Sequence, residues 1–216
     1  MTGRAQPDQH AAPASVVAAV VTYGDRAERV IETVTAVLAE GVAAVLVVDN
    51  GSQASAAARL DALAAEEPRV TVHRLERNGG SAQGFSEAIR VGSSLGHRHL
   101  LLVDDDNVLL GGSLELAVQT VEGAPDDVPI AVAIPRLADG SHAAVLAGQP
   151  VAESYAVGGE FFEFDVRRRL SRRRPSAPIV PPEAPVVVPR TPYGGLLLRT
   201  RDVAALGMPR ADFVLY

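Results

Sequence analysis

Short apolar segments alternate with amphipathic segments along the first 134 residues, and this alternation most constrains the fold. The apolar segments have the length and composition of buried strands, whereas the segments between them carry apolar residues at helical spacing. Strands that alternate with helices predict right-handed βαβ units and a mostly parallel sheet. The predicted strands are 15–21, 43–48, 70–75, 99–103 and 130–134, and the predicted helices are 26–40, 54–66, 82–95 and 113–121.

This pattern predicts the α/β class, with a doubly wound, Rossmann-like sheet that carries helices on both faces. We expect residues 1–13 to be a disordered tail and residues 14–134 to form the α/β domain. Residues 135–216 are expected to form an incomplete second part, with a strand at 193–198 and a helix at 200–206. Within it, the Arg- and Pro-rich segment 166–192 is predicted to be flexible. Its arginines could contact anionic lipid or a phosphorylated acceptor, or could simply be solvated.

Polar or glycine-rich segments follow four of the predicted strands, at Thr22–Asp25, Asp49–Ser52, Arg77–Ser81 and Asp104–Asn107. Ligands of doubly wound sheets bind outside the carboxyl ends of the strands. The sequence therefore predicts that these four segments meet at one edge of the sheet and form its binding site.

Three adjacent carboxylates, Asp104, Asp105 and Asp106, follow an apolar strand. In an extended backbone, Asp104 and Asp106 would point to the same side, which suits a hard cation such as Mn²⁺ or Mg²⁺. Such a cation would neutralise a diphosphate, so Asp104 and Asp105 are predicted to bind a nucleotide and Asp104 and Asp106 a metal. The alternative interpretation is an acidic start to the next helix.

The segments after the first two strands could hold a nucleoside. Asp49 could accept a hydrogen bond from a ribose hydroxyl or a base imino group, or could belong to a plain turn. Thr22 and Tyr23 could hold a base by hydrogen bonding and stacking, or Tyr23 could cover the edge of the core. Asn78 and Gly79 precede a helix and could offer backbone N–H groups to a phosphate. Alternatively, they form a loop in which Ser81 caps the helix.

Composition excludes several classes of protein. The net charge of −6 disfavours a nucleic-acid partner, which would require a basic face. The chain has no cysteine, which excludes disulfides and thiolate metal sites. It shows neither a signal peptide nor an apolar run long enough to span a bilayer. We therefore expect a cytoplasmic protein, either free or peripheral at the inner face of the plasma membrane.

Taken together, these motifs resemble those of inverting family-two glycosyltransferases with the GT-A fold. The matching segments are Val20–Tyr23, Val47–Ser52, Asn78–Ser81 with Gly84 and Phe85, and Leu102–Asn107. Tyr193–Arg199, Gly207–Pro209 and Asp212–Phe213 are similar to the acceptor-side segment of that family. The similarity is greatest to rhamnosyl- and galactofuranosyltransferase-like enzymes of bacterial cell-wall polysaccharide.

The resemblance implies a role for each matching residue. Thr22 and Asp49 would hold the nucleoside, Asp104 and Asp106 the metal and the diphosphate, and Gly194 and Gly195 would lie beside the acceptor sugar. The implied reaction is metal-dependent hexosyl transfer with inversion, from a nucleoside-diphosphate sugar to a glycan or lipid-linked acceptor. UDP- or dTDP-sugars are expected as donors ahead of GDP-sugars, although the sequence does not choose between the three nucleotides. The general base is expected beyond Tyr216, so no catalytic residue is assigned.

Two other functions are compatible with parts of the sequence. One is a truncated, non-catalytic module that binds a nucleotide sugar without transferring it. The other is a sugar-phosphate nucleotidyltransferase, which would need a glycine-rich basic loop after the first strand. Residues 22–26 do not form such a loop.

Overall fold

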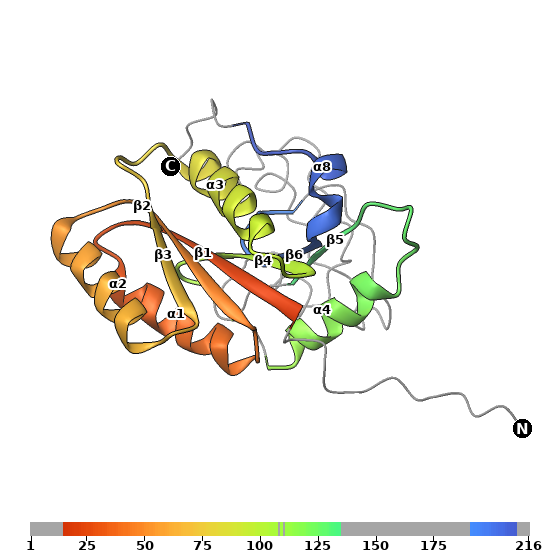
Figure 1. The fold of residues 1–216 in the computed structure, drawn as a ribbon, viewed down its shortest axis with the longest axis horizontal. Coiled ribbons are helices and arrows are strands. Elements are labelled where there is room, and N and C mark those ends of the chain that lie inside the picture. The colour runs from red at the N-terminus through yellow and green to blue at the C-terminus, as the bar shows by residue number, and fades with distance from the viewer. Residues whose placement is uncertain (1–14, 108, 110, 135–190, 211–216) are drawn as a thin grey trace, which may run out of the picture. The chain divides into compact units, whose positions relative to one another are not determined.

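The computed structural model describes residues 15–107, 109, 111–134 and 191–210 (Figure 1). The chain divides into two units, Met1–Ile134 with Tyr193–Tyr216 and Pro135–Pro192, and all described helices and strands belong to the first. The tail 1–13, which was predicted to be disordered, lies outside the described residues. The segment 166–192, which was predicted to be flexible, also lies outside them except for its last two positions.

The described elements lie within a few residues of the predicted ones. The strands are β1 Val16–Gly24, β2 Ala44–Ser52, β3 Val70–Arg74, β4 His99–Asp104, β5 Ala131–Ala133 and β6 Leu196–Arg199. The helices are α1 Ala27–Ala39, α2 Ala54–Glu66, α3 Ser81–Ser94, α4 Ser113–Glu122 and α8 Val203–Leu206, with a 3-10 helix, η2, at Thr200–Asp202.

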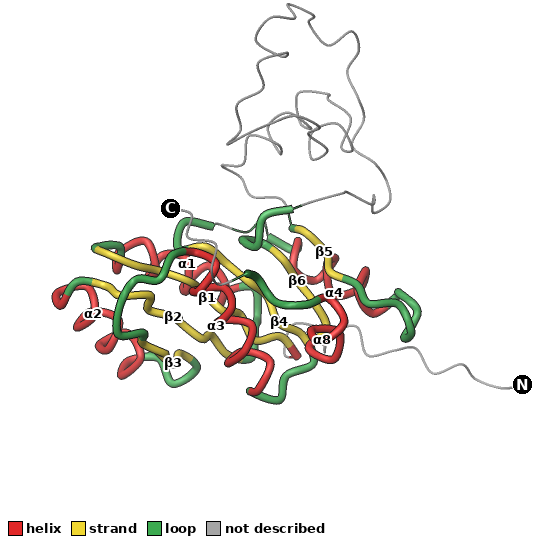
Figure 2. Tube along the Cα trace, turned by 90° about the horizontal axis from the view of Figure 1, so that it is seen from above, coloured by secondary structure: helices red, strands yellow, loops and turns green. Residues whose placement is uncertain are grey.

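The six strands form one sheet in the order β3-β2-β1-β4-β6-β5 (Figure 2). Strands β3, β2, β1 and β4 are parallel, whereas β6 runs antiparallel to both of its neighbours, β4 and β5. The prediction of a mostly parallel α/β sheet is therefore confirmed. Strand β6 comes from beyond residue 134 and fills the position between β4 and β5.

Both faces of the sheet are covered, because the central strands are apolar along most of their length. Val16, Ala18 and Val20 of β1 face the cluster built on α1, α2 and α4. Val17 and Ala19 face the cluster built on α3, which also includes Val203 at the start of α8. Figure 1 shows α3 and α8 on one side of the sheet and the other three helices on the opposite side. This two-sided burial is typical of parallel sheets.

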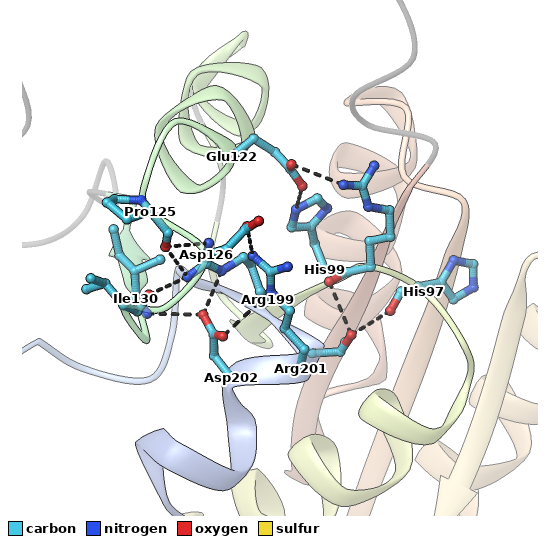
Figure 3. A network of polar contacts seen from close by, with 12 residues as sticks. His97, His99, Glu122, Pro125, Asp126, Ile130, Arg199, Arg201 and Asp202 are labelled. Atoms are coloured by element: carbon cyan, nitrogen blue, oxygen red, sulfur yellow. Dashed lines mark hydrogen bonds and ion pairs between the residues drawn. The ribbon is translucent and has the colours of Figure 1, made fainter.

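A buried polar network fixes β6 at the edge where β4 begins (Figure 3). The Nε of Arg199 donates to Asp202 Oδ2 at 2.6 Å, and its Nη2 donates to the carbonyl of Val128. Asp202 Oδ2 also accepts the backbone N–H of Ile130 at 3.2 Å. Burial raises the pKa of Asp202, but these hydrogen bonds and the charge of Arg199 outweigh it and hold the pKa below its ordinary value. The network ties η2 to the loop between α4 and β5.

None of the helices in the described part of the chain is both long and apolar enough to cross a membrane.

Candidate functional site

The carboxyl edge of the sheet gathers most of the predicted site residues. In the parallel register, Thr22 of β1 lies opposite Asp49 of β2, and Val21 lies opposite Asp104 of β4. Strand β6 starts at the same edge because it is antiparallel, and the N–H of Gly195 donates to Leu102 O at 2.7 Å. The strand order reverses between β1 and β4, the position at which such sheets bind ligands.

The three aspartates occupy different environments because β4 ends at Asp104. A turn follows, closed by the N–H of Asn107, which donates to Asp104 O at 3.2 Å. The extended alternation that would align Asp104 with Asp106 therefore stops. Asp104 is half-buried, Asp105 is buried, and the side chain of Asp106 is 52% exposed with Arg29 Nη1 at 3.9 Å. The next helix, α4, starts only at Ser113, so the aspartates do not cap it.

Asp105 points into the protein rather than toward solvent. Its Oδ2 accepts from Thr22 Oγ1 at 2.9 Å and its Oδ1 accepts from Arg26 Nη1 at 3.0 Å. Its backbone carbonyl accepts from Thr33 Oγ1 of α1. Burial raises the pKa of Asp105, and the charge of Asp106 adds to this, whereas Thr22 and Arg26 oppose it. Asp105 thus connects β1, α1 and the aspartate turn.

Tyr23 and Arg26 lie next to the contacts of Asp105, because Arg26 bonds to Asp105 and also contacts the ring of Tyr23. The guanidinium carbon of Arg26 lies 4.2 Å from the centre of the Tyr23 ring, a cation–π contact. Tyr23 is 37% exposed, so one face of its ring is covered by Arg26 while part of the ring remains open to a ligand. Arg26 therefore links the ring that was predicted to stack on a base to the aspartate turn.

Asp49 is fully buried and both of its oxygens are bonded within the protein. Strand β2 continues to Ser52, so Asp49 lies in a strand rather than in a plain turn. Its Oδ1 accepts the N–H of Ser52 at 2.8 Å, and its Oδ2 accepts Arg74 Nε at 2.7 Å. A nucleoside hydroxyl would have to share one of these oxygens or displace Arg74.

The loop before α3 is held by Asn50, whose side chain is buried. Asn50 Oδ1 accepts the N–H of Gly79 at 3.1 Å, and its Nδ2 donates to Gly80 O at 2.9 Å. The N–H of Gly80 donates to Asn78 Oδ1, so both glycine N–H groups are engaged. Helix α3 starts with Ser81 itself after the N-cap Gly80, whose φ is +86°, so Ser81 is not the cap.

Gly195 meets the aspartate turn at a very close approach. Its φ is +87°, and a Cβ there would lie 2.5 Å from Ile134 O and 3.3 Å from Asn107 Nδ2. Only glycine combines that conformation with that contact. Asn107 is fully buried, and neither atom of its side-chain amide has a hydrogen-bond partner among the described residues. Leaving such a group unpaired costs about 1–3 kcal/mol.

An aromatic pair lies beside the predicted acceptor turn. The ring of Tyr193 stacks on Phe85 of α3, with 5.3 Å between the ring centres and 26° between their planes. Phe85 is buried, whereas Tyr193 is 40% exposed and directly precedes Gly194. The pair joins α3 to the chain that enters β6.

Sequence reasoning gave no individual role to Arg26, Asn50 or Asn107. Asn50 and Asn107 lie within the polar segments after strands, but short polar side chains there are also ordinary turn residues. Arg26 directly follows such a segment and gives no local signal. Their roles depend on partners far away in sequence, such as Gly79 for Asn50 and Asp105 for Arg26.

A family model described as "Glycosyl transferase family 2" matches residues 17–148, which is more than half of the chain. No curated protein matches the chain. Many solved structures show partial likeness, and three of them are described below. The first is the mannosyltransferase PcManGT from Pyrobaculum calidifontis in complex with GDP-Man and Mn²⁺, with 23% identity and a TM-score of 0.47 over 59% of this chain and 37% of that one.

The second solved structure is TarS 1-349 from S. aureus, with 20% identity and a TM-score of 0.41 over 50% of this chain and 32% of that one. The third is GalNAc-T7 with UDP, GalNAc and Mn²⁺, with 21% identity and a TM-score of 0.35 over 42% of this chain and 17% of that one. The matched part of this chain thus spans less than two fifths of the length of each of these proteins.

Proposed function

The chain belongs to glycosyl transferase family 2, and we propose that it binds a nucleoside-diphosphate sugar at the carboxyl edge of its sheet and serves hexosyl transfer. The observation that carries this proposal is the meeting of three segments at one edge. They are the end of β1 with Thr22 and Tyr23, the aspartate turn after β4, and the Gly194–Gly195 turn before β6. A donor laid across this edge would reach all three.

A divalent cation, Mn²⁺ or Mg²⁺, fits the aspartate turn only as a partner of the diphosphate. No group of three or more His, Cys, Asp or Glu side chains positioned to hold a metal occurs among the described residues. Mg²⁺ is commonly bound by one or two carboxylates together with substrate phosphates and water, rather than by an all-protein cage. Asp104 and Asp106 can supply those two carboxylates. When bound, the cation would neutralise the diphosphate as it leaves.

The other residues of the edge bind and orient the donor. The open part of the Tyr23 ring can cover a base, with its other face held by Arg26. Thr22 and Asp105 keep this ring close to the aspartate turn, through the bond between their side chains. Asp49 would hold the nucleoside by sharing an oxygen that already accepts Ser52 N–H or Arg74 Nε. Asn78 and Gly79 would border the phosphates from the loop that Asn50 holds.

We further propose that UDP or dTDP is the donor nucleotide and that the acceptor is a glycan or lipid-linked sugar in cell-wall polysaccharide synthesis. The motif resemblance to rhamnosyl- and galactofuranosyltransferase-like enzymes supports this class. Gly194, Gly195 and the exposed ring of Tyr193 would border the acceptor, since sugars pack on aromatic faces through their apolar C–H surfaces. The reaction proposed is a single displacement with inversion, in which a carboxylate deprotonates the acceptor hydroxyl.

The test is a calorimetric titration of the full chain with UDP, dTDP and GDP, with and without Mn²⁺. We expect Mn²⁺-dependent binding in the wild type and its loss when Asp104→Ala and Asp106→Ala are combined. The matched control combines Glu115→Ala with Asp127→Ala, two exposed carboxylates away from this edge, and should bind as the wild type does. Unchanged affinity in the aspartate double variant would refute the assignment. Transfer is assayed separately, so that binding without turnover identifies a non-catalytic module.

A further inference from the structure

We propose that Asn107 is a specificity-determining residue that binds two hydroxyls of the transferred sugar through its side-chain amide. This inference rests on the proposed function, because it names the part of the donor that this position recognises. The observation that carries it is an amide that is fully buried and that, in the part of the chain that the structure describes, has no partner for either Nδ2 or Oδ1.

The location of Asn107 indicates that it contacts the transferred sugar rather than another part of the donor. Its backbone N–H closes the aspartate turn at Asp104, and its side chain packs against Gly195, 3.3 Å from the position a Cβ would take there. The amide thus lies between the turn proposed for the diphosphate and the turn proposed for the acceptor. In a displacement with inversion, the sugar must lie between the leaving group and the attacking hydroxyl, and so between these two turns.

The chemistry of the amide matches a sugar. A primary amide offers N–H donors on one side and a carbonyl acceptor on the other. Two neighbouring hydroxyls of a hexose can accept from the first and donate to the second. A diphosphate can only accept, so it would leave Oδ1 unpaired, and a cation would leave Nδ2 unpaired. A sugar diol satisfies both atoms. The ribose and the base could do so as well, but they are proposed to lie at the ends of β1 and β2, whereas Asn107 follows the aspartate turn after β4.

Gly195 gives the contact room to form. Because Gly195 has no Cβ, the side-chain amide of Asn107 lies directly against the backbone of Gly195. Because the side chain is covered in this structure, the contact requires the aspartate turn and the Gly195 turn to separate slightly as the sugar enters. The side chain of Asp106, at the outer end of the same turn, is half exposed, so that end of the turn is not packed into the core.

The experiment measures two affinities in the full chain with Mn²⁺, one for the nucleoside diphosphate and one for the same nucleotide carrying a hexose. Asn107→Leu keeps the branched outline and the number of heavy atoms of the side chain, with a larger volume, and removes both polar atoms. We expect nucleoside diphosphate affinity within twofold of the wild type and hexose-nucleotide affinity reduced about tenfold, the effect of leaving hydroxyls unpaired. A nucleotide that carries a deoxy-hexose lacking one of the two hydroxyls should show a smaller difference in affinity between the wild type and the variant.

Ser93→Ala is the matched control, since Ser93 Oγ is another buried polar atom without a partner, in the last turn of α3. It should change neither affinity. Equal losses for both ligands in Asn107→Leu would overturn the proposal, because the residue would then act on the diphosphate or the cation. Unchanged affinities would overturn it as well. If the wild type bound no nucleotide at all, the proposed function itself would fail first.

Thermal unfolding provides a second, independent readout. If Asn107 has no partner within the protein, Asn107→Leu should melt no lower than the wild type, because an unpaired buried amide is replaced by an apolar group. A clear drop in melting temperature would show that the amide supports the fold, and would overturn the proposal.

Discussion

Asn50 connects two polar segments that are separated by almost thirty residues. Its amide joins the end of β2 to Gly79 and Gly80 with one accepted and one donated hydrogen bond. Gly51 allows the approach, because a Cβ at its φ of +80° would lie 2.4 Å from the backbone nitrogen of Asn78. The loop before α3 is therefore shaped by the protein itself before any phosphate is present.

Replacing Asn50 with alanine should destabilise the protein by about 2 kcal/mol, because Gly79 N–H and Gly80 O lose their partner. Urea denaturation measures this loss, and amide hydrogen exchange should speed up at the first turn of α3. The neighbouring exposed residue provides the control: Gln53→Ala should be nearly neutral. Equal stability of Asn50→Ala and the wild type would show that the loop does not depend on this amide.

The sequence predicted the positions of the site residues better than their contacts. The sheet edge followed from apolar segments ending in polar ones, so Thr22, Asp49 and Asp104 were correctly expected to lie side by side. Which side chains would bond to each other could not be predicted. Arg74 reaches Asp49 from another strand and Thr22 reaches Asp105 across the sheet, and such pairs depend on tertiary packing rather than on local pattern.

At the scale of elements, the short segment after β6 is fixed by charge as well as by packing. Arg199 and Asp202 form a buried ion pair, and Arg199 also donates to the carbonyls of Pro125 and Val128. Nearby, Arg201 and Asp126 form an exposed pair. The two pairs differ in burial and in the backbone hydrogen bonds that only the buried pair makes, so together they test how much a buried, bonded pair contributes.

Asp202→Ala should cost about 3 kcal/mol at neutral pH, since it leaves the Arg199 charge buried without its partner. Because the pKa of Asp202 is lowered in the folded protein, its contribution is present above about pH 4 and is lost as pH falls through the lowered value. The stability curves of variant and wild type should therefore converge in acid. Asp126→Ala, at the exposed pair, should change little at any pH. Parallel curves for Asp202→Ala and the wild type would contradict this account.

At the scale of the whole chain, the sheet of the first unit contains strands from both sides of the segment Pro135–Pro192: β1 to β5 precede it in the sequence and β6 follows it. The N–H of Ile134 donates to Gly195 O at 2.7 Å, so the points where this segment leaves and returns are neighbours in the sheet. All residues proposed for donor binding lie outside the segment. Sequence pattern alone could not place β6 between β4 and β5, because its partner residues lie about a hundred positions away in β4 and about 65 positions away in β5.

Replacing Pro135–Pro192 with a Gly/Ser linker of about six residues should therefore preserve the sheet and Mn²⁺-dependent nucleotide binding. Circular dichroism, thermal melting and nucleotide titration check the outcome. The same linker combined with Leu197→Arg should not fold, since Leu197 is fully buried in β6. Loss of the fold with the linker alone would show that the sheet depends on the segment.

The place of β6 also dictates an order of assembly during synthesis. Strand β5 pairs only with β6 among the described strands, so it cannot join the sheet before residues 196–199 have left the ribosome. Until then β4 is an open edge with apolar residues Leu100, Leu101 and Leu102, a surface on which other chains can add strands. The nascent protein is thus most exposed to misassembly between the emergence of β4 and that of β6, an interval of about a hundred residues of translation.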